Sequence, residues 1–149
     1  MSEKVQFSLP NQDGDVVTSD DFAGKKYVMF FYPRAMTPGC TTESCDFRDS
    51  YTEFSEAGYE VIGVSPDPPS RNAKFKEKEG LNFDLLSDED HALAESLGAW
   101  GEKQLYGKLM EGLIRSTFVV DEDSEVEKAY RNVRASGHVA RVKEELLGG

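Results

Sequence analysis

The sequence predicts an α/β protein in which helices flank a central mixed β-sheet. Two short apolar segments rich in aromatic and β-branched residues are each followed by a more polar segment with helical features, which is the order of a β-α-β unit. Near the carboxyl end, a strong strand, an acidic turn and a second strand form a hairpin pattern, and an amphipathic helix follows. This combination favours one mixed sheet covered by helices.

The first unit begins with residues 26–32 (KYVMFFY), a nearly continuous apolar run that is typical of a central strand buried on both faces. Pro33 ends this strand. From Pro38 to Gly58 apolar residues fall at helical intervals, so we expect a helix there. Residues 59–64 (YEVIGV) predict a second buried strand.

A more polar helix and a short strand come next. The proline-rich residues 65–69 are a loop, and Ser70 is the expected cap of a helix that runs to about Glu79. Residues 83–86 then predict a short strand.

The following segment predicts one further helix before the pattern becomes ambiguous. Ser87 or Asp88 can cap a helix that continues through Leu97 and is closed by Gly98. Residues 99–112 favour neither a helix nor a strand, so they carry no assignment.

The carboxyl third contains the clearest hairpin. Residues 113–120 (LIRSTFVV) predict a strong strand, and the acidic segment 121–124 is the turn. Residues 125–131 are the expected hairpin partner, and 137–147 predict a last amphipathic helix. No repeat or linker divides the sequence, so we expect residues 1–149 to form a single domain.

Composition limits the classes of function. The net charge is -11, with 28 acidic and 17 basic side chains, which argues against general binding to nucleic acid or anionic membranes. The acidity favours solubility, and adaptation to high salt is an alternative explanation. No signal-peptide pattern or long apolar stretch is present, so we expect a cytoplasmic protein that does not associate with a membrane.

Two cysteines are too few for a disulfide-rich scaffold and cannot alone supply the four ligands of a structural zinc site. The only histidines, His91 and His138, lie far in sequence from each other and from both cysteines. We therefore expect no metal site. The spacing of Cys40 and Cys45 also differs from the Cys-x-x-Cys pattern of thioredoxin-like reductases, and no glycine-rich phosphate loop is present.

Cys40 lies where a loop becomes a helix, after the carboxyl end of a predicted strand. Ligands usually bind at that edge of a parallel sheet. The unpaired N–H groups and the dipole at a helix start stabilise a thiolate over a thiol. Pro38 and Gly39 leave the backbone open to a small polar ligand. The alternative is that Cys40 is simply a small buried side chain at a helix start.

The segment around Cys40, PRAMTPGCTTE, resembles the active-site signature of the peroxiredoxins, which are thiol peroxidases of the thioredoxin fold. The segments GLIRSTFVVD and RNVRASGHVARV resemble the bacterioferritin-comigratory, or Q-type, subfamily. The resemblance implies a thioredoxin-like fold and a thiol peroxidase that needs no metal, haem or flavin.

The resemblance also implies roles for individual residues. Cys40 would be the peroxidatic cysteine, which attacks a hydroperoxide and becomes a sulfenic acid. The hydroxyl group of Thr37 would hydrogen-bond the thiolate and the peroxide, and Pro33 would limit solvent access to the sulfur. Each has a structural alternative, with Thr37 as a cap and Pro33 as a strand terminator.

Arg115, Glu43 and Gly39 complete the implied site. Arg115 is near the start of an apolar strand, and in the family it faces the cysteine, where a permanent cation stabilises developing negative charge. Glu43 would orient this arginine, and Gly39 would leave room for the substrate. Arg115 could instead reach solvent past the strand end, and Glu43 could simply complement the helix dipole.

Cys45 would be the resolving cysteine, because the Q-type arrangement has both redox cysteines on one helix. Five helical residues separate two Cα atoms by roughly 8.5–9 Å, whereas a disulfide rarely tolerates more than about 7 Å. The helix must therefore unwind locally before the disulfide forms. The resemblance implies that thioredoxin or a similar dithiol protein then reduces it. Alternatively, Cys45 is a core residue.

Two questions stay open at this level. The same reactive cysteine would suit a peroxide-sensing redox switch that relays oxidation to a partner protein. The substrate preference is also open: four apolar residues could form a collar for organic hydroperoxides, although core packing is the more common role. They are Met36, Trp100, Tyr106 and Met110. Q-type relatives are often monomers, so we expect a monomer rather than a dimer.

Overall fold

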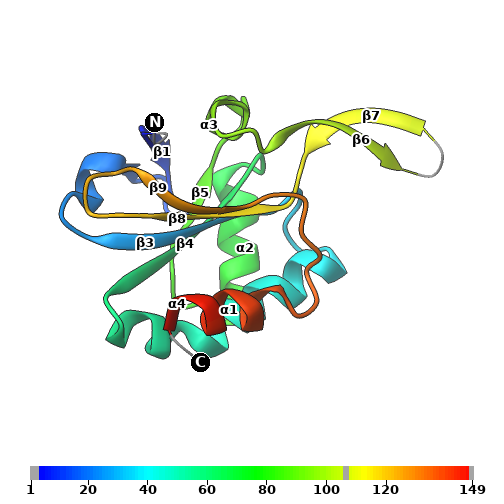
Figure 1. The fold of residues 1–149 in the computed structure, drawn as a ribbon. Helices are drawn as coiled ribbons and strands as arrows, with labels where there is room; N and C mark the ends of the chain where they lie inside the picture. The colour runs from blue at the N-terminus through cyan, green and yellow to red at the C-terminus, as the bar shows by residue number, and fades with distance from the viewer. Residues whose placement is uncertain (1–3, 106–107, 148–149) are drawn as a thin grey trace.

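The computed structural model describes residues 4–105 and 108–147, and a five-stranded sheet lies at its centre (Figure 1). The strand order is β5-β4-β3-β8-β9. Strands β3, β4 and β5 are parallel to one another, whereas β8 runs antiparallel to both β3 and β9. The bounds are β3 Lys26–Phe31, β4 Tyr59–Ser65, β5 Leu85–Ser87, β8 Ser116–Val120 and β9 Val126–Tyr130. The predicted mixed sheet is confirmed.

The alternation of side chains along β3 divides the core into two layers. Val28, Phe30 and the following Tyr32 belong to one buried cluster, whereas Met29 and Phe31 belong to the other. All five are 0% exposed. A strand that is apolar on both faces must be covered on both faces, which explains the continuous apolar run in the sequence.

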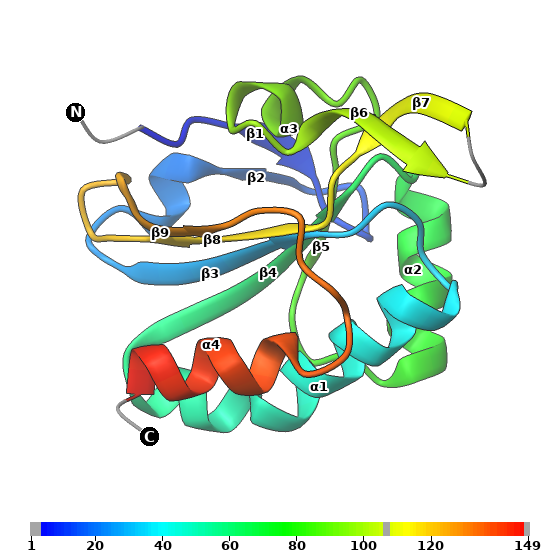
Figure 2. The ribbon, with the colours of Figure 1, turned by 45° about the vertical axis from the view of Figure 1, so that its right-hand side comes forward.

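Three helices cover the first face of the sheet. They are α1 Pro38–Glu56, α2 Pro69–Glu79 and α4 His138–Leu147. Side chains from all three join the cluster around Phe30, and α4 lies alongside α1 in both views (Figures 1 and 2). The two parallel crossovers run through α1 and α2, so the start of each helix follows the carboxyl end of a strand.

The second face is covered by shorter elements. They are β1 Ser8–Pro10, β2 Val16–Thr18, the 3₁₀ helix Ser19–Phe22 and α3 Ala92–Ser96. Residues 99–112, which carried no assignment, contain a second hairpin of β6 (Trp100–Leu105) and β7 (Lys108–Leu113). This hairpin projects beyond the central sheet (Figures 1 and 2).

The predicted strand 113–120 is interrupted. Leu113 ends β7 and pairs with Trp100, and β8 begins only at Ser116. Between them, the N–H of Ile114 donates to Ala99, and the carbonyl of Arg115 accepts from Val133. These two residues hydrogen-bond to loops instead of β3, so Arg115 lies in a break between strands and not within one.

Several boundaries also differ from the expectations. β5 begins at Leu85, two residues later than predicted. Pro68, and not Ser70, is the N-cap of α2. The helix after β5 begins at Ala92, so Asp88 lies before its N-cap residue. The Asp88 carboxylate still accepts hydrogen bonds from two N–H groups at the start of α3. These details depend on loop geometry that the apolar pattern does not encode.

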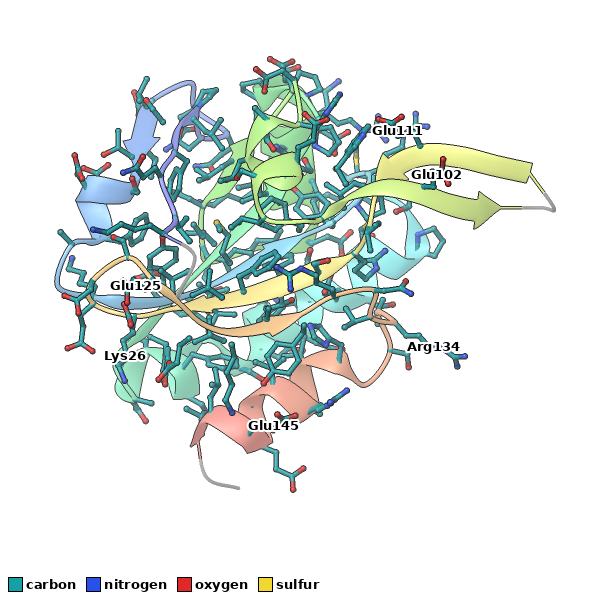
Figure 3. All side chains as sticks on the ribbon, turned by 45° about the horizontal axis from the view of Figure 1, so that its top comes forward. Lys26, Glu102, Glu111, Glu125, Arg134 and Glu145 are labelled. Atoms are coloured by element: carbon teal, nitrogen blue, oxygen red, sulfur yellow. The ribbon has the colours of Figure 1, made fainter. Side chains whose placement is uncertain are left out.

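Apart from the buried Glu43, Asp67 and Asp88, the charged side chains that the structure describes are partly or fully exposed, and the labelled Glu102, Arg134 and Glu145 lie at the periphery (Figure 3). Placing most of the excess negative charge in water avoids the cost of burying it. Within residues 4–105 and 108–147, no helix is long and apolar enough to cross a membrane.

A buried histidine gives the fold a pH dependence. Burial, helped by the positive charges of Arg141 and Arg115, lowers the pKa of His138 from 6.5 to about 4, although Glu145 opposes the shift. The ring Nε2 lies 2.8 Å from the hydroxyl oxygen of Thr117. The folded chain therefore holds a neutral imidazole where the unfolded chain would hold a charged one.

We expect the stability advantage of the wild type over His138→Gln to shrink as the pH falls from about 6.5 towards 4, because only the wild type must protonate a buried ring. Urea unfolding at several pH values gives the free energy of unfolding of both proteins. In the difference between them, the contributions of the carboxylates that both proteins share cancel. A difference that does not change with pH would show that His138 is not held neutral.

Candidate active site

Cys40 lies in the first turn of α1, directly behind the carboxyl edge of the sheet. Thr37 is the N-cap residue, and Pro38 occupies the first turn, where a missing N–H costs nothing. The Cys40 side chain is 0% exposed and packs in the same cluster as Ala35 and Tyr32. A sulfur at this position lies close to the positive end of the helix dipole.

Arg115 connects Cys40 with Glu43. One guanidinium nitrogen, Nη2, donates to Cys40 Sγ at 3.3 Å, and the other, Nη1, donates to Glu43 Oε1 at 2.7 Å. The arginine side chain is 15% exposed and the glutamate is fully buried. The break between β7 and β8 supplies the arginine, and successive turns of α1 supply the other two residues.

The pKa values of Arg115 and Glu43 reflect both their burial and their attraction to each other. Burial lowers the pKa of Arg115, but Glu43 and Cys40 outweigh this effect and keep the guanidinium charged. For Glu43 the balance is reversed, because burial raises its pKa to about 7 and Arg115 opposes the shift only in part. Its Oε2 atom has no hydrogen-bond partner among the described residues.

The loop between β3 and α1 holds the other candidates. Pro33 is half-buried where β3 ends. The Thr37 hydroxyl donates to the carbonyl of Arg34 at 2.8 Å, so its proton is used within the loop and is not directed at the sulfur. The hydroxyl oxygen keeps its capacity to accept a hydrogen bond. A Cβ on Gly39 would lie 3.1 Å from Arg115 Nη2, which explains why glycine suits this position.

Cys45 lies on the same continuous helix as Cys40, and both thiols are free. Its Sγ lies 3.6 Å from Glu79 Oε1 at the end of α2, where the thiol donates to the carboxylate. Burial and this carboxylate raise the pKa of the Cys45 thiol, although Arg48 opposes them. The two cysteines therefore have different environments, with a cation beside Cys40 and an anion beside Cys45.

The other candidates lie in different places. His91 stacks on Trp100 with ring centroids 3.7 Å apart, whereas His138 begins α4. In the described part of the chain, no group of three or more His, Cys, Asp or Glu side chains could hold a metal ion. Met36 packs against the cluster that contains Cys40. Tyr106 and the side chain of Met110 lie outside what the structure describes.

Sequence reasoning missed the contacts of Asp67 and Arg71. Both side chains bind the backbone of Ala35, within the loop that leads to Cys40. The sequence did indicate that Asp67 lies near this loop. Asp67 follows the end of β4, and the carboxyl ends of parallel strands meet at one edge of the sheet.

Comparison with known proteins identifies several relatives. Residues 2–129 match the model of the AhpC/TSA family. Peroxiredoxin Bcp of Escherichia coli strain K12 is 47% identical over 133 residues, which cover 89% of this chain and 85% of that protein. Peroxiredoxin Bcp of Bacillus subtilis is 46% identical over 138 residues, which cover 93% of this chain and 88% of that protein.

Solved structures give the same result. The bacterioferritin comigratory protein of Xanthomonas campestris, described with alkyl peroxide reduction activity, superposes with a TM-score of 0.89 at 37% identity, covering 95% of this chain and 90% of that one. PrxQ of Xylella fastidiosa has a TM-score of 0.91 at 28% identity, covering 99% of this chain and 95% of that one.

We expect Gly39→Ala to destabilise the protein by about 1 kcal/mol, because the new methyl group displaces the Arg115 guanidinium from a packed position. In an Arg115→Ala background the same substitution should be neutral or stabilising, since alanine favours a helix over glycine. Chemical unfolding of the four proteins of this double-mutant cycle measures the coupling. Equal effects of Gly39→Ala in both backgrounds would contradict the contact.

We expect wild type to lose stability relative to Glu43→Gln as the pH rises from about 4.5 to about 7. The folded state raises the pKa of this buried carboxyl, so its ionisation above pH 4.5 costs more in the folded chain than in the unfolded chain. Unfolding free energies of both proteins between pH 5 and 8 test the sign. A difference that moves in the opposite direction would mean that Arg115 outweighs burial.

Proposed function

This chain belongs to the AhpC/TSA family and is a peroxiredoxin with a thioredoxin-like fold, and from this premise we propose that Cys40 is its peroxide-reactive cysteine. The observation that carries the proposal is the 3.3 Å contact between Arg115 Nη2 and Cys40 Sγ at the start of a helix. A fixed cation and the helix dipole both stabilise a thiolate there.

In the first step, the Cys40 thiolate attacks the terminal oxygen of a hydroperoxide. The O–O bond breaks, the sulfur becomes a sulfenic acid, and the leaving oxygen takes a proton and departs as an alcohol or as water. Arg115 stabilises the negative charge that develops on the oxygens, while Glu43 holds the guanidinium in position. The Thr37 hydroxyl oxygen is a candidate to accept a hydrogen bond from the hydroperoxide O–H.

In the second step, the Cys45 thiol attacks the sulfur of the Cys40 sulfenic acid. A disulfide forms, and the sulfenic oxygen leaves as water with the proton from Cys45. An intact α1 keeps the Cα atoms roughly 8.5–9 Å apart, beyond the usual limit of about 7 Å for a disulfide. The first turns of α1 must therefore unwind, and Cys45 must leave Glu79.

We propose that thioredoxin or a similar dithiol protein reduces this disulfide and completes the cycle. The assignment is supported by the Bcp relatives and by two cysteines that lie close together in sequence. Both hydrogen peroxide and organic hydroperoxides are the proposed substrates, because alkyl peroxide reduction is described for the Xanthomonas campestris protein. We also propose that the enzyme acts as a monomer in the cytoplasm.

The Cys40 function is tested by hydroperoxide-dependent NADPH consumption through thioredoxin and its reductase. We expect Cys40→Ser to abolish turnover and Arg115→Ala to lower the second-order rate constant about 10²- to 10³-fold, because a charge-stabilising donor is lost. Arg134→Ala removes an exposed arginine and is the control. An Arg115→Ala rate within a few-fold of wild type would contradict the transition-state role.

The resolving role of Cys45 is tested by intact-mass analysis after one equivalent of peroxide. Wild type should lose two hydrogens, whereas Cys45→Ser should gain one oxygen. Persistence of sulfenic acid in wild type would contradict the role. A single stoichiometric oxidation without turnover, followed by capture of a partner protein, would favour the redox switch instead.

A further inference from the structure

Asp67 and Arg71 form an ion pair beside the loop that leads to the reactive cysteine. Asp67 follows β4, Arg71 lies in the first turn of α2, and Asp67 Oδ1 is 3.3 Å from Arg71 Nε. The aspartate side chain is only 9% exposed and the arginine is 31% exposed. The chain between β3 and α1 passes beside α2 (Figure 2). A pair at this depth is less screened by water than a surface pair.

The pair binds both backbone groups of a single loop residue. Asp67 Oδ2 accepts the N–H of Ala35 at 2.7 Å, and Arg71 Nη2 donates to the Ala35 carbonyl at 2.9 Å. Ala35 is 0% exposed, so in this conformation its backbone groups are bound by the pair and not by bulk water. Hydrogen bonds from charged groups to a buried backbone are among the stronger ones in proteins. The peptide groups on both sides of Ala35 are therefore fixed.

The position of Ala35 matters for Cys40. Both residues pack in one buried cluster, and Met36 packs against that cluster. Met36 has a φ of 66°, in the left-handed region that a non-glycine residue rarely adopts. Such a conformation persists only where the surrounding structure enforces it. The bonds to Ala35 supply that restraint immediately before Thr37 caps α1.

The pair is itself held by a buried polar network. Asn72, the neighbour of Arg71, accepts from the Tyr32 hydroxyl at 2.6 Å and donates to the Ser87 hydroxyl at 3.2 Å. The Ser65 hydroxyl accepts the N–H of Asp67 at 3.2 Å. These contacts connect the pair to the carboxyl ends of β3, β4 and β5.

We propose that Asp67 and Arg71 are a positioning pair that holds the 33–37 loop, and with it the helical, peroxide-reactive conformation of the Cys40 segment. This inference rests on the proposed function. The pair acts through Ala35 and does not touch the reacting atoms. Its strength sets the balance between the helical form, in which Cys40 meets peroxide, and the unwound form, in which Cys40 meets Cys45.

The balance decides the fate of the sulfenic acid. In the unwound form it condenses with the Cys45 thiol and releases water. In the helical form a second hydroperoxide can oxidise it to a sulfinic acid, with one oxygen transferred to sulfur and an alcohol or water released. A weaker pair should therefore slow the peroxide reaction, speed disulfide formation and reduce over-oxidation.

The experiment measures both steps in one series of proteins. Reduced Asp67→Asn, Arg71→Lys and wild type are mixed with hydrogen peroxide, quenched with acid at intervals and analysed by intact mass. We expect the rate of oxygen addition to fall about tenfold, the rate of disulfide formation to rise several-fold, and the sulfinic acid yield at a fixed excess of peroxide to fall. Arg71→Lys keeps the charge and should have the smaller effects.

Arg141→Lys is the matched control, because Arg141 and Glu145 form an i,i+4 ion pair at 2.9 Å on α4. Its rates should equal those of wild type. Rates within twofold of wild type in both pair variants, or a slowing of both steps together, would overturn the positioning role. If wild-type Cys40 itself does not react with peroxide, the proposed function fails as well, so the two failures are distinguishable.

Discussion

Two cysteines five residues apart on one continuous helix constrain the reaction cycle of this protein. An α-helix fixes the distance between residues five apart, and this distance exceeds what a disulfide accepts. The conformation that places Cys40 beside Arg115 is therefore one in which Cys40 cannot reach Cys45. Reaction with peroxide and resolution of the product require two conformations of the same segment.

Different elements of the fold hold the groups that react with peroxide and the cysteine that resolves the product. Arg115 comes from a break between strands whose backbone is hydrogen-bonded to neighbouring loops, so its backbone is anchored independently of α1. The Cys45 thiol donates a hydrogen bond to Glu79, and a thiol is a weak donor. The loop before the helix is bound more firmly, through both backbone groups of Ala35. Unwinding of the helix start therefore breaks the Arg115 contact to Cys40 and exposes a buried side chain.

The sequence was sufficient for the sheet and for most of the residues around Cys40, and physical reasons explain what it missed. The apolar run of β3 is typical of a strand covered on both faces, PRAMTPGCTTE indicated Cys40, and the family resemblance that GLIRSTFVVD shares indicated its distant partner Arg115. The break before Ser116 was not predicted, because it depends on a change of backbone hydrogen-bond partners at Ile114 and Arg115, which the side-chain pattern does not encode. The position of Asp67 after β4 indicated the right edge of the sheet, but the side-chain pattern does not show that its partner is the backbone N–H of Ala35. The Thr37 hydroxyl was expected to face the sulfur, but its proton is donated to Arg34.

Amide hydrogen exchange along α1 is the most direct test of the central claim that Cys40 and Cys45 pair only after the helix start unwinds. Reduced protein should protect the amides of residues 41–46 strongly, because they lie within a continuous helix. After one equivalent of peroxide the same amides should exchange much faster, while those of residues 50–56 stay protected. Unchanged protection of residues 41–46 in the disulfide form would contradict the account.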